Sequence, residues 1–201
     1  MMGMVNTRWQ RTDVPRGTDY DARWRSLAAN GQNIHGEADL VEALLGDFGG
    51  RAVLDAGCGT GRVAIELARR GFTVDAVDAD PDMLAAAQAK APALNWRHGD
   101  LADPGVLAGI GPVDLVLLAG NVMIFLEPGT ESRVLGSLAG RLTPGGLLVA
   151  GFALQPDGLT LTRYDEIAAA AGLQPAARWA TWDRQPFDGG DYAVCVHGAR
   201  R

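Results

Sequence analysis

Beyond its first quarter, the chain alternates short apolar runs with stretches of helical periodicity. The apolar runs predict strands at residues 52–54, 72–77, 94–98, 113–118 and 147–152. The fourth of these is almost continuously apolar, which is typical of a parallel strand covered on both faces. Strands that alternate with helices predict a parallel sheet with helices on both sides, and this constrains the fold more than any other feature.

Helical patterns separate these strands and precede the first of them. They predict helices at 19–29, 36–48, 62–70, 81–90, 104–108, 130–142 and 162–171. The last helix is expected to begin at a capping box formed by Thr162 and Asp165. Two final strands are predicted at 177–183 and 192–197, and the Asp-Gly-Gly sequence at 188–190 favours a hairpin between them. The last strand should therefore run antiparallel to its neighbour.

Composition excludes several classes of partner. The formal net charge of −6 gives no general attraction for nucleic acid or an anionic membrane. The longest apolar stretch, 113–126, contains Asp114 and Asn121 and is shorter than the roughly 20 residues of a spanning helix. The first residues lack the apolar core of a secretory signal, so we expect a cytoplasmic protein. Cys58 and Cys195 lie far apart and form no metal-binding pair, so no metal is expected.

A glycine-rich loop follows the first predicted strand directly. Gly57, Gly59 and Gly61 allow tight turning and close approach of the backbone to a ligand, and a helix N-terminus follows. A dinucleotide fingerprint would require glycine where Arg62 stands. Asp55, before the loop, would repel a pyrophosphate but can accept hydrogen bonds from an ammonium group. The loop therefore favours a zwitterionic nucleoside over NAD.

Acidic residues end the next two predicted strands. Asp78 ends the second strand, where a carboxylate can accept hydrogen bonds from both ribose hydroxyls. Asp100 follows the third strand and can accept a hydrogen bond from an exocyclic amine such as that of adenine. Leu101 can pack on one face of the adenine ring, and Met83 can cover the other.

This set of residues resembles the class I S-adenosylmethionine-dependent methyltransferases, over about residues 50–200. The most specific segment is 53–61, which is close to the family's first motif. Further segments occur in the family's order and at its usual intervals: Asp78, 99–100, 113–116 and 142–146. The resemblance implies a Rossmann-like α/β fold, with helices on both faces of a seven-stranded, mostly parallel sheet whose last strand is antiparallel. It also implies S-adenosylmethionine as cofactor and S-adenosylhomocysteine as product.

The resemblance also implies roles for residues and segments. We expect helices that cap the cofactor site over 18–50 and the cofactor-binding methyltransferase domain over 51–201. Residues 1–17 carry no periodic pattern, and for that reason we expect a mobile N-terminal arm there. The asparagine at the end of the fourth strand can contact the cofactor. The residues expected to bind the cofactor are Asp55, Gly57, Cys58, Gly59, Gly61, Asp78, Ala79, Met83, Asp100, Leu101, Ala119 and Asn121.

Catalytic residues are harder to predict because the cofactor is already activated. The protein mainly positions the acceptor atom about 3–3.5 Å from the methyl carbon, and a base is needed only for a protonated, poorly acidic acceptor. Candidates are Asn121, His35 and Tyr20. Each also has a structural interpretation: Asn121 as a capping residue, His35 as an exposed or capping histidine, and Tyr20 as a packing residue. No Asn/Asp-Pro-Pro-aromatic motif follows the fourth strand, which disfavours amino-group methylation of bases or glutamine.

We therefore expect a methyltransferase that acts on a small molecule, without a nucleic-acid or membrane partner. The acceptor, the methylated atom and the oligomeric state do not follow from the sequence. Two alternatives remain open. One is an NAD(P)-dependent oxidoreductase on a Rossmann-like sheet, and the other is a protein that binds S-adenosylmethionine without catalysis.

Overall fold

The computed structural model describes residues 7–46 and 49–200. The helices are the 3₁₀ turns η1 (Trp9–Arg11) and η2 (Pro104–Leu107), and α1 (Gly17–Ala29), α2 (Gly36–Gly46), α3 (Arg62–Arg69), α4 (Pro81–Lys90), α5 (Val122–Phe125), α6 (Glu131–Ala139) and α7 (Leu161–Ala170). The strands are β1 (Ala52–Ala56), β2 (Thr73–Asp78), β3 (Asn95–His98), β4 (Val113–Leu118), β5 (Leu142–Ala153), β6 (Leu173–Trp179) and β7 (Tyr192–Ala199).

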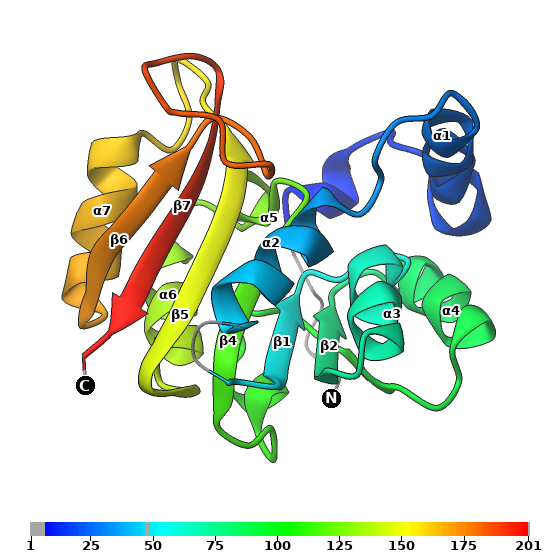
Figure 1. Cartoon of the computed structure of the whole chain (residues 1–201), viewed down its shortest axis with the longest axis horizontal. Helices are drawn as coiled ribbons and strands as arrows, with labels where there is room; N and C mark the ends of the chain where they lie inside the picture. Colours follow the sequence, from blue (N-terminus) through cyan, green and yellow to red (C-terminus); the bar gives the residue numbers. More distant parts are fainter. Residues whose placement is uncertain (1–6, 47–48, 201) are drawn as a thin grey trace.

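The strands form one seven-stranded sheet in the order β3-β2-β1-β4-β5-β7-β6. The pairs from β3 to β5 are all parallel, whereas β7 runs antiparallel to both β5 and β6. Figure 1 shows β7 directed opposite to its neighbour β5. The predicted fold class, including the antiparallel last strand, is confirmed.

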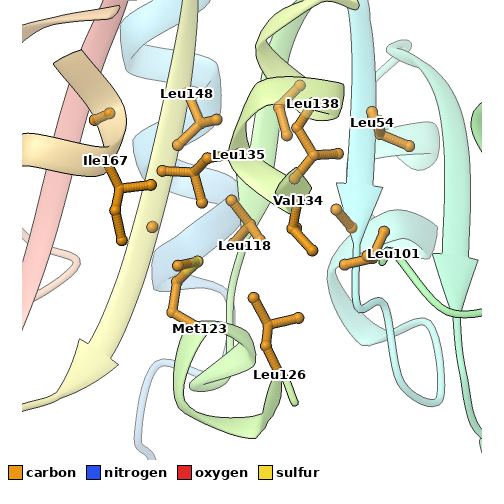
Figure 2. Packing of buried hydrophobic residues seen from close by; sticks show 14 of the residues in the cluster. Leu54, Leu101, Leu118, Met123, Leu126, Val134, Leu135, Leu138, Leu148 and Ile167 are labelled. Carbon is orange, nitrogen blue, oxygen red and sulfur yellow. The ribbon is translucent and has the colours of Figure 1, made fainter. Parts of the chain in front are cut away.

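Helices cover the two faces of the sheet because successive strand residues point to opposite sides. In β4, Leu115 and Leu117 pack into the hydrophobic cluster beneath α2 and α3. The alternate residues, Val116 and Leu118, pack into a second hydrophobic cluster on the other face of the sheet, beneath α5, α6 and α7. Figure 2 shows this second cluster, with Leu135 and its neighbours on α6 directed at the sheet. A run of apolar residues without polar alternation is thus the expected sequence of a central strand.

Strand β5 is longer than predicted. The helix expected over 130–142 ends at Ala139, and Leu142 already pairs with Val113 of β4. The Pro-Gly-Gly sequence at 144–146 lies within the strand instead of forming a turn before it, because a register shift between Val113 and Leu115 accommodates it. The strand boundary at 147 was therefore wrong.

Two predictions near the C-terminus were also wrong. Helix α7 begins one residue before Thr162, because the side chain of Thr160 accepts a hydrogen bond from Arg163 N at 3.2 Å and caps the helix instead. Strand β6 ends at Trp179 rather than extending over 177–183. The chain turns away there, since Ala180 N bonds to Gln185 O.

The N-terminal segment lies above the sheet. Of the expected arm over residues 1–17, residues 1–6 lie outside the described residues, as do residues 47–48 at the end of the second predicted helix. Helix α1 stands apart from the sheet, over α3 and α4 (Figure 1), whereas α2 packs on the sheet itself. None of the described helices has the length and apolar character needed to cross a membrane.

Candidate functional site

A cavity lies at the carboxyl ends of the parallel strands, beneath the N-terminal segment. We call it the main cavity. The carboxyl ends of β1 and β2 and the loops that follow β1 to β4 contribute Asp55, Gly57, Cys58, Gly59, Thr60, Asp78, Ala79, Asp100, Leu101, Ala119 and Gly120. The helices and the N-terminal segment contribute Thr7, Trp9, Tyr20, Trp24, Arg62, Val63, Met83, Val122, Phe125 and Leu126. All residues predicted to bind the cofactor line this cavity except Gly61 and Asn121.

The glycine loop bends tightly around the end of β2. The backbone N–H groups of Gly57 and Cys58 both donate to Val77 O, at 2.8 and 3.0 Å. Gly57 has a φ of +86°, and a Cβ atom there would lie 2.4 Å from Val122 Cγ2. Only glycine fits this position, so the loop keeps its backbone exposed at the cavity wall.

Asp55 is a buried carboxylate at the cavity wall that lacks a partner for one oxygen. The residue is 1% exposed, and Oδ2 makes no hydrogen bond. Burial raises the pKa of Asp55 to about 7, with Arg62 opposing this shift and Asp78 adding to it. A buried acceptor without a partner is costly. The site therefore fits a ligand that brings a positively charged donor.

Asp78 is held in place from two sides. Its Oδ2 accepts from Gly59 N at 2.7 Å, and its Oδ1 accepts from Asp80 N at 2.8 Å. Burial raises the pKa of Asp78, against these backbone hydrogen bonds. Each carboxylate oxygen can accept a second hydrogen bond. The carboxylate is thus oriented to receive a pair of hydroxyl groups.

Asp100, in the loop after β3, lies beside apolar side chains of the main cavity. Asp100 Oδ1 accepts from Ala102 N at 2.8 Å, which fixes the side chain. Leu101 and Met83 are buried and line the same cavity. A carboxylate beside two apolar side chains can hold a flat heterocycle with an amino group.

Several contacts hold the N-terminal segment (residues 7–16) over the cavity. Arg8 N bonds to Phe125 O at 2.9 Å, Arg11 pairs with Glu127, and two further side chains bond to one carboxylate. Asp80 Oδ2 accepts from Trp9 Nε1 at 2.8 Å and from Arg16 Nε at 2.5 Å. The Arg16 guanidinium also lies over the Trp9 ring, 5.2 Å from its centroid. This anchoring brings Thr7 and Trp9 into the cavity wall. No sequence pattern indicated these two residues, because they precede the first periodic segment.

Arg62 links three helices at the edge of the cavity. Its guanidinium pairs with Glu37 at 2.5 Å, donates to Ile34 O, and lies 3.8 Å from the centroid of the Trp24 ring. The side chains of Arg62 and Glu37 are only 14% and 10% exposed. Arg62, which stands where a dinucleotide fingerprint requires glycine, thus forms a largely buried ion pair with Glu37.

The three catalytic candidates are placed differently. Tyr20 lines the cavity. His35 does not, and its backbone N–H bonds to Asn33 Oδ1 at the start of α2. Asn121 points away from the cavity, since its Oδ1 accepts from Ala153 N at 2.8 Å and joins β4 to the end of β5. Gly61 also lies outside, where a Cβ atom would meet the Trp96 ring at 2.4 Å.

The arrangement as a whole suits an adenosine derivative that carries an ammonium group. Asp55, with one oxygen lacking a partner, Asp78 and Asp100 lie at the carboxyl ends of three neighbouring strands, along the same edge of the sheet. Ligands of open α/β sheets bind at this edge. Among the described residues, no group of three or more histidine, cysteine or acidic side chains is placed to hold a metal ion.

Comparisons with known proteins agree with this geometry. A family model described as a methyltransferase domain matches residues 53–146. The solved structure of a TehB-like SAM-dependent methyltransferase from Corynebacterium glutamicum is 33% identical, with a TM-score of 0.80. That similarity covers 92% of this chain and 97% of the other.

Two curated relatives match only part of this chain and only about half of their own length. The magnesium-protoporphyrin O-methyltransferase of Rhodobacter capsulatus is 36% identical over 109 residues, which are 52% of this chain and 46% of that protein. A ubiquinone biosynthesis O-methyltransferase of Caulobacter sp. (strain K31) is 35% identical over 137 residues, 66% and 50% of the two chains. The chain spans about half the length of these curated relatives.

Proposed function

Because this chain belongs to the class I S-adenosylmethionine-dependent methyltransferases, we propose that it transfers the methyl group of S-adenosylmethionine to a small-molecule acceptor in the main cavity. The sulfonium cofactor supplies an activated methyl group. The chain's own residues bind and orient both molecules and exclude water. Family membership argues against the oxidoreductase alternative.

Each part of the cofactor matches a group in the cavity. We assign the ammonium group to Asp55, whose Oδ2 lacks a partner, and the methionine end to the backbone of Gly57, Cys58 and Gly59. The ribose hydroxyls are assigned to Asp78, which two backbone N–H groups orient. Charge-assisted hydrogen bonds of this kind contribute about 1.5–3 kcal/mol each.

The adenine is assigned to the next acidic loop. The Asp100 carboxylate accepts from the exocyclic amine, and Leu101 and Met83 enclose the ring. Ala79 and Ala119 complete the wall, and their small side chains leave room for the nucleoside.

The observation that most supports this function is Asp55. A carboxylate that is 1% exposed, with one oxygen unpartnered, faces a cavity beside a glycine loop. An ammonium group resolves the cost of that burial, whereas a diphosphate would increase it.

We also propose a small acceptor and a cytoplasmic location. The N-terminal segment contributes Thr7 and Trp9 to the wall of the main cavity and is tied to Asp80, which restricts access for a polymer. The net charge of −6 disfavours nucleic acid. The names of the two curated relatives refer to magnesium-protoporphyrin and to ubiquinone biosynthesis, both small molecules.

Calorimetry tests the proposal directly. S-adenosylhomocysteine, S-adenosylmethionine, NAD and NADP are titrated separately into the purified chain. We expect micromolar binding of the two sulfur nucleosides and none of the dinucleotides. Binding of NAD(P) alone would overturn the assignment. Cofactor binding without transfer of a labelled methyl group to any compound of a metabolite extract would favour the non-catalytic alternative.

A further inference from the structure

The main cavity has a second wall that the proposed cofactor contacts do not use. This aromatic wall consists of Trp9, Tyr20 and Phe125, from the N-terminal segment, α1 and α5. Val122 and Leu126 add apolar surface beside it. These elements follow β4 or precede β1, so they lie apart from the three acidic loops in the sequence, and they line the same cavity.

The rings of the aromatic wall hold one another in place. The Trp9 ring meets Phe125 at 5.2 Å between centroids and Tyr20 at 6.2 Å, with interplanar angles of 78° and 83°. Edge-to-face contacts of this kind are a favoured arrangement for aromatic side chains. Trp9 is fixed further by its hydrogen bond to Asp80. The wall is therefore preformed, and a flat molecule can pack against it without reordering side chains.

Charge in the cavity disfavours an anionic acceptor. Asp55, Asp78 and Asp100 all line it. Arg62 is the cation among the described lining residues, and Glu37 and Ile34 O already engage its guanidinium. Among the lining residues that the structure describes, an anion would thus have three carboxylates nearby and no cation without a partner.

Proton acceptors on the acceptor's side are scarce. The described residues that line the main cavity include no histidine or lysine, two common general bases. Its three carboxylates belong to the loops assigned to the cofactor. The Thr7 hydroxyl, buried without a partner beside the aromatic wall, can orient a ligand but is a poor base.

Resting on the proposed function, we infer that the acceptor is a planar, uncharged small molecule that binds against Trp9, Tyr20 and Phe125. It attacks through an atom whose lone pair is already free at neutral pH, such as a ring nitrogen. That lone pair forms the new bond to the methyl carbon while the carbon–sulfur bond breaks, and the bonding pair stays on sulfur. The positive charge passes from the sulfonium to the methylated acceptor, where the ring faces stabilise it.

Three probes of similar size separate the possibilities: isoquinoline, with a free ring lone pair, 2-naphthol, which must lose a proton, and the anion 2-naphthoate. Calorimetry in saturating S-adenosylhomocysteine measures binding, and labelled S-adenosylmethionine measures transfer. We expect isoquinoline to bind at least about tenfold more tightly than 2-naphthoate. We expect it to accept methyl at least about tenfold faster than 2-naphthol.

Three results would contradict this inference. Equal or tighter binding of 2-naphthoate, faster transfer to 2-naphthol, or no binding of any probe to the complex with S-adenosylhomocysteine would overturn the inference. Failure of S-adenosylhomocysteine itself to bind would instead overturn the proposed function.

Variants locate the subsite. Phe125→Leu and Tyr20→Leu each remove one ring, and we expect isoquinoline binding to weaken about fivefold. S-adenosylhomocysteine affinity, which reports an intact fold, should change less than about twofold. The matched control Phe187→Leu removes a partly buried ring outside the main cavity and should change neither affinity. Unchanged isoquinoline binding in both ring variants would place the acceptor elsewhere.

Discussion

Asp55 shows how one residue links burial to binding. Asp55 lies one residue before the end of β1, where burial disfavours its charged form and raises its pKa to about 7. Strong pKa shifts of this kind concentrate at functional sites. The energetic cost of the buried charge is recovered only when a cationic group arrives.

Binding of S-adenosylhomocysteine should therefore depend on pH. Above pH 7 the Asp55 carboxyl is ionised and attracts the ligand's ammonium group. Below pH 7 it is protonated, so affinity should fall by up to about tenfold per pH unit. Calorimetry from pH 5.5 to 8.5 measures this change, and Asp55→Asn should bind weakly with a flat profile. A flat profile in the unaltered chain would refute the assignment of Asp55.

Asp78 offers a second test at the residue scale. We expect Asp78→Ala to weaken S-adenosylhomocysteine binding by at least about tenfold, because the ribose loses its charged acceptor. Asp75→Ala is the matched control, since it removes a carboxylate from the same strand outside the main cavity. Equal effects of the two changes would mean that the ribose lies elsewhere.

At the scale of elements, the N-terminal segment depends on contacts distant in sequence. Arg16 pairs with Asp80, which also caps α4 and donates its N–H to Asp78. The segment that carries Trp9 is thereby tied to the proposed ribose carboxylate.

Arg16→Ala should loosen this segment, although the bonds of Arg8 to Phe125 and of Arg11 to Glu127 remain. Chymotrypsin should cleave after Trp9 at least about fivefold faster, because loss of the ion pair with the buried Asp80 makes local opening more frequent. Arg163→Ala removes an exposed ion pair with Glu166 on α7 and is the control. If both variants are cleaved at the rate of the unaltered chain, the Asp80 contacts do not hold the segment.

Sequence periodicity located elements better than their ends. The predicted helix 81–90 and strand 113–118 agree with α4 and β4 residue for residue. The start of β5 and the extent of β6 were wrong, because strand ends depend on pairing partners and on the bulge opposite Val113. Helix α5 was not predicted, since four residues carry too little periodicity.

For the whole molecule, the acidic side of the main cavity was more predictable than the aromatic wall. Asp55, Asp78 and Asp100 stand at strand ends, and parallel strands bring their carboxyl ends to one edge. Trp9 and Phe125 reach the same cavity from an aperiodic segment and a short helix. Their positions arise from tertiary contacts that no local pattern encodes.

A buried histidine in β7 should make the stability of the whole fold depend on pH. His197 on β7 is 1% exposed and lies 3.3 Å from Asp165 Oδ1 without a hydrogen bond. Burial lowers the pKa of His197, although Asp165 counteracts it. The unfolded chain therefore binds a proton that the folded chain resists.

The free energy of unfolding should fall as the pH drops below about 6.5, the ordinary histidine value. His197→Gln should make this decrease less steep, as measured by urea unfolding between pH 5 and 8. The exposed His98→Gln serves as the control. An equal slope in His197→Gln and the unaltered chain would exclude this origin.

We infer that an ammonium-bearing adenosine derivative binds at the edge of the sheet above β1 and β2. A crystal structure of the chain grown with S-adenosylhomocysteine tests it most directly. We predict the ammonium group within hydrogen-bond distance of Asp55 and both ribose hydroxyls on Asp78. An empty main cavity, or the nucleoside bound at another place, would contradict the account.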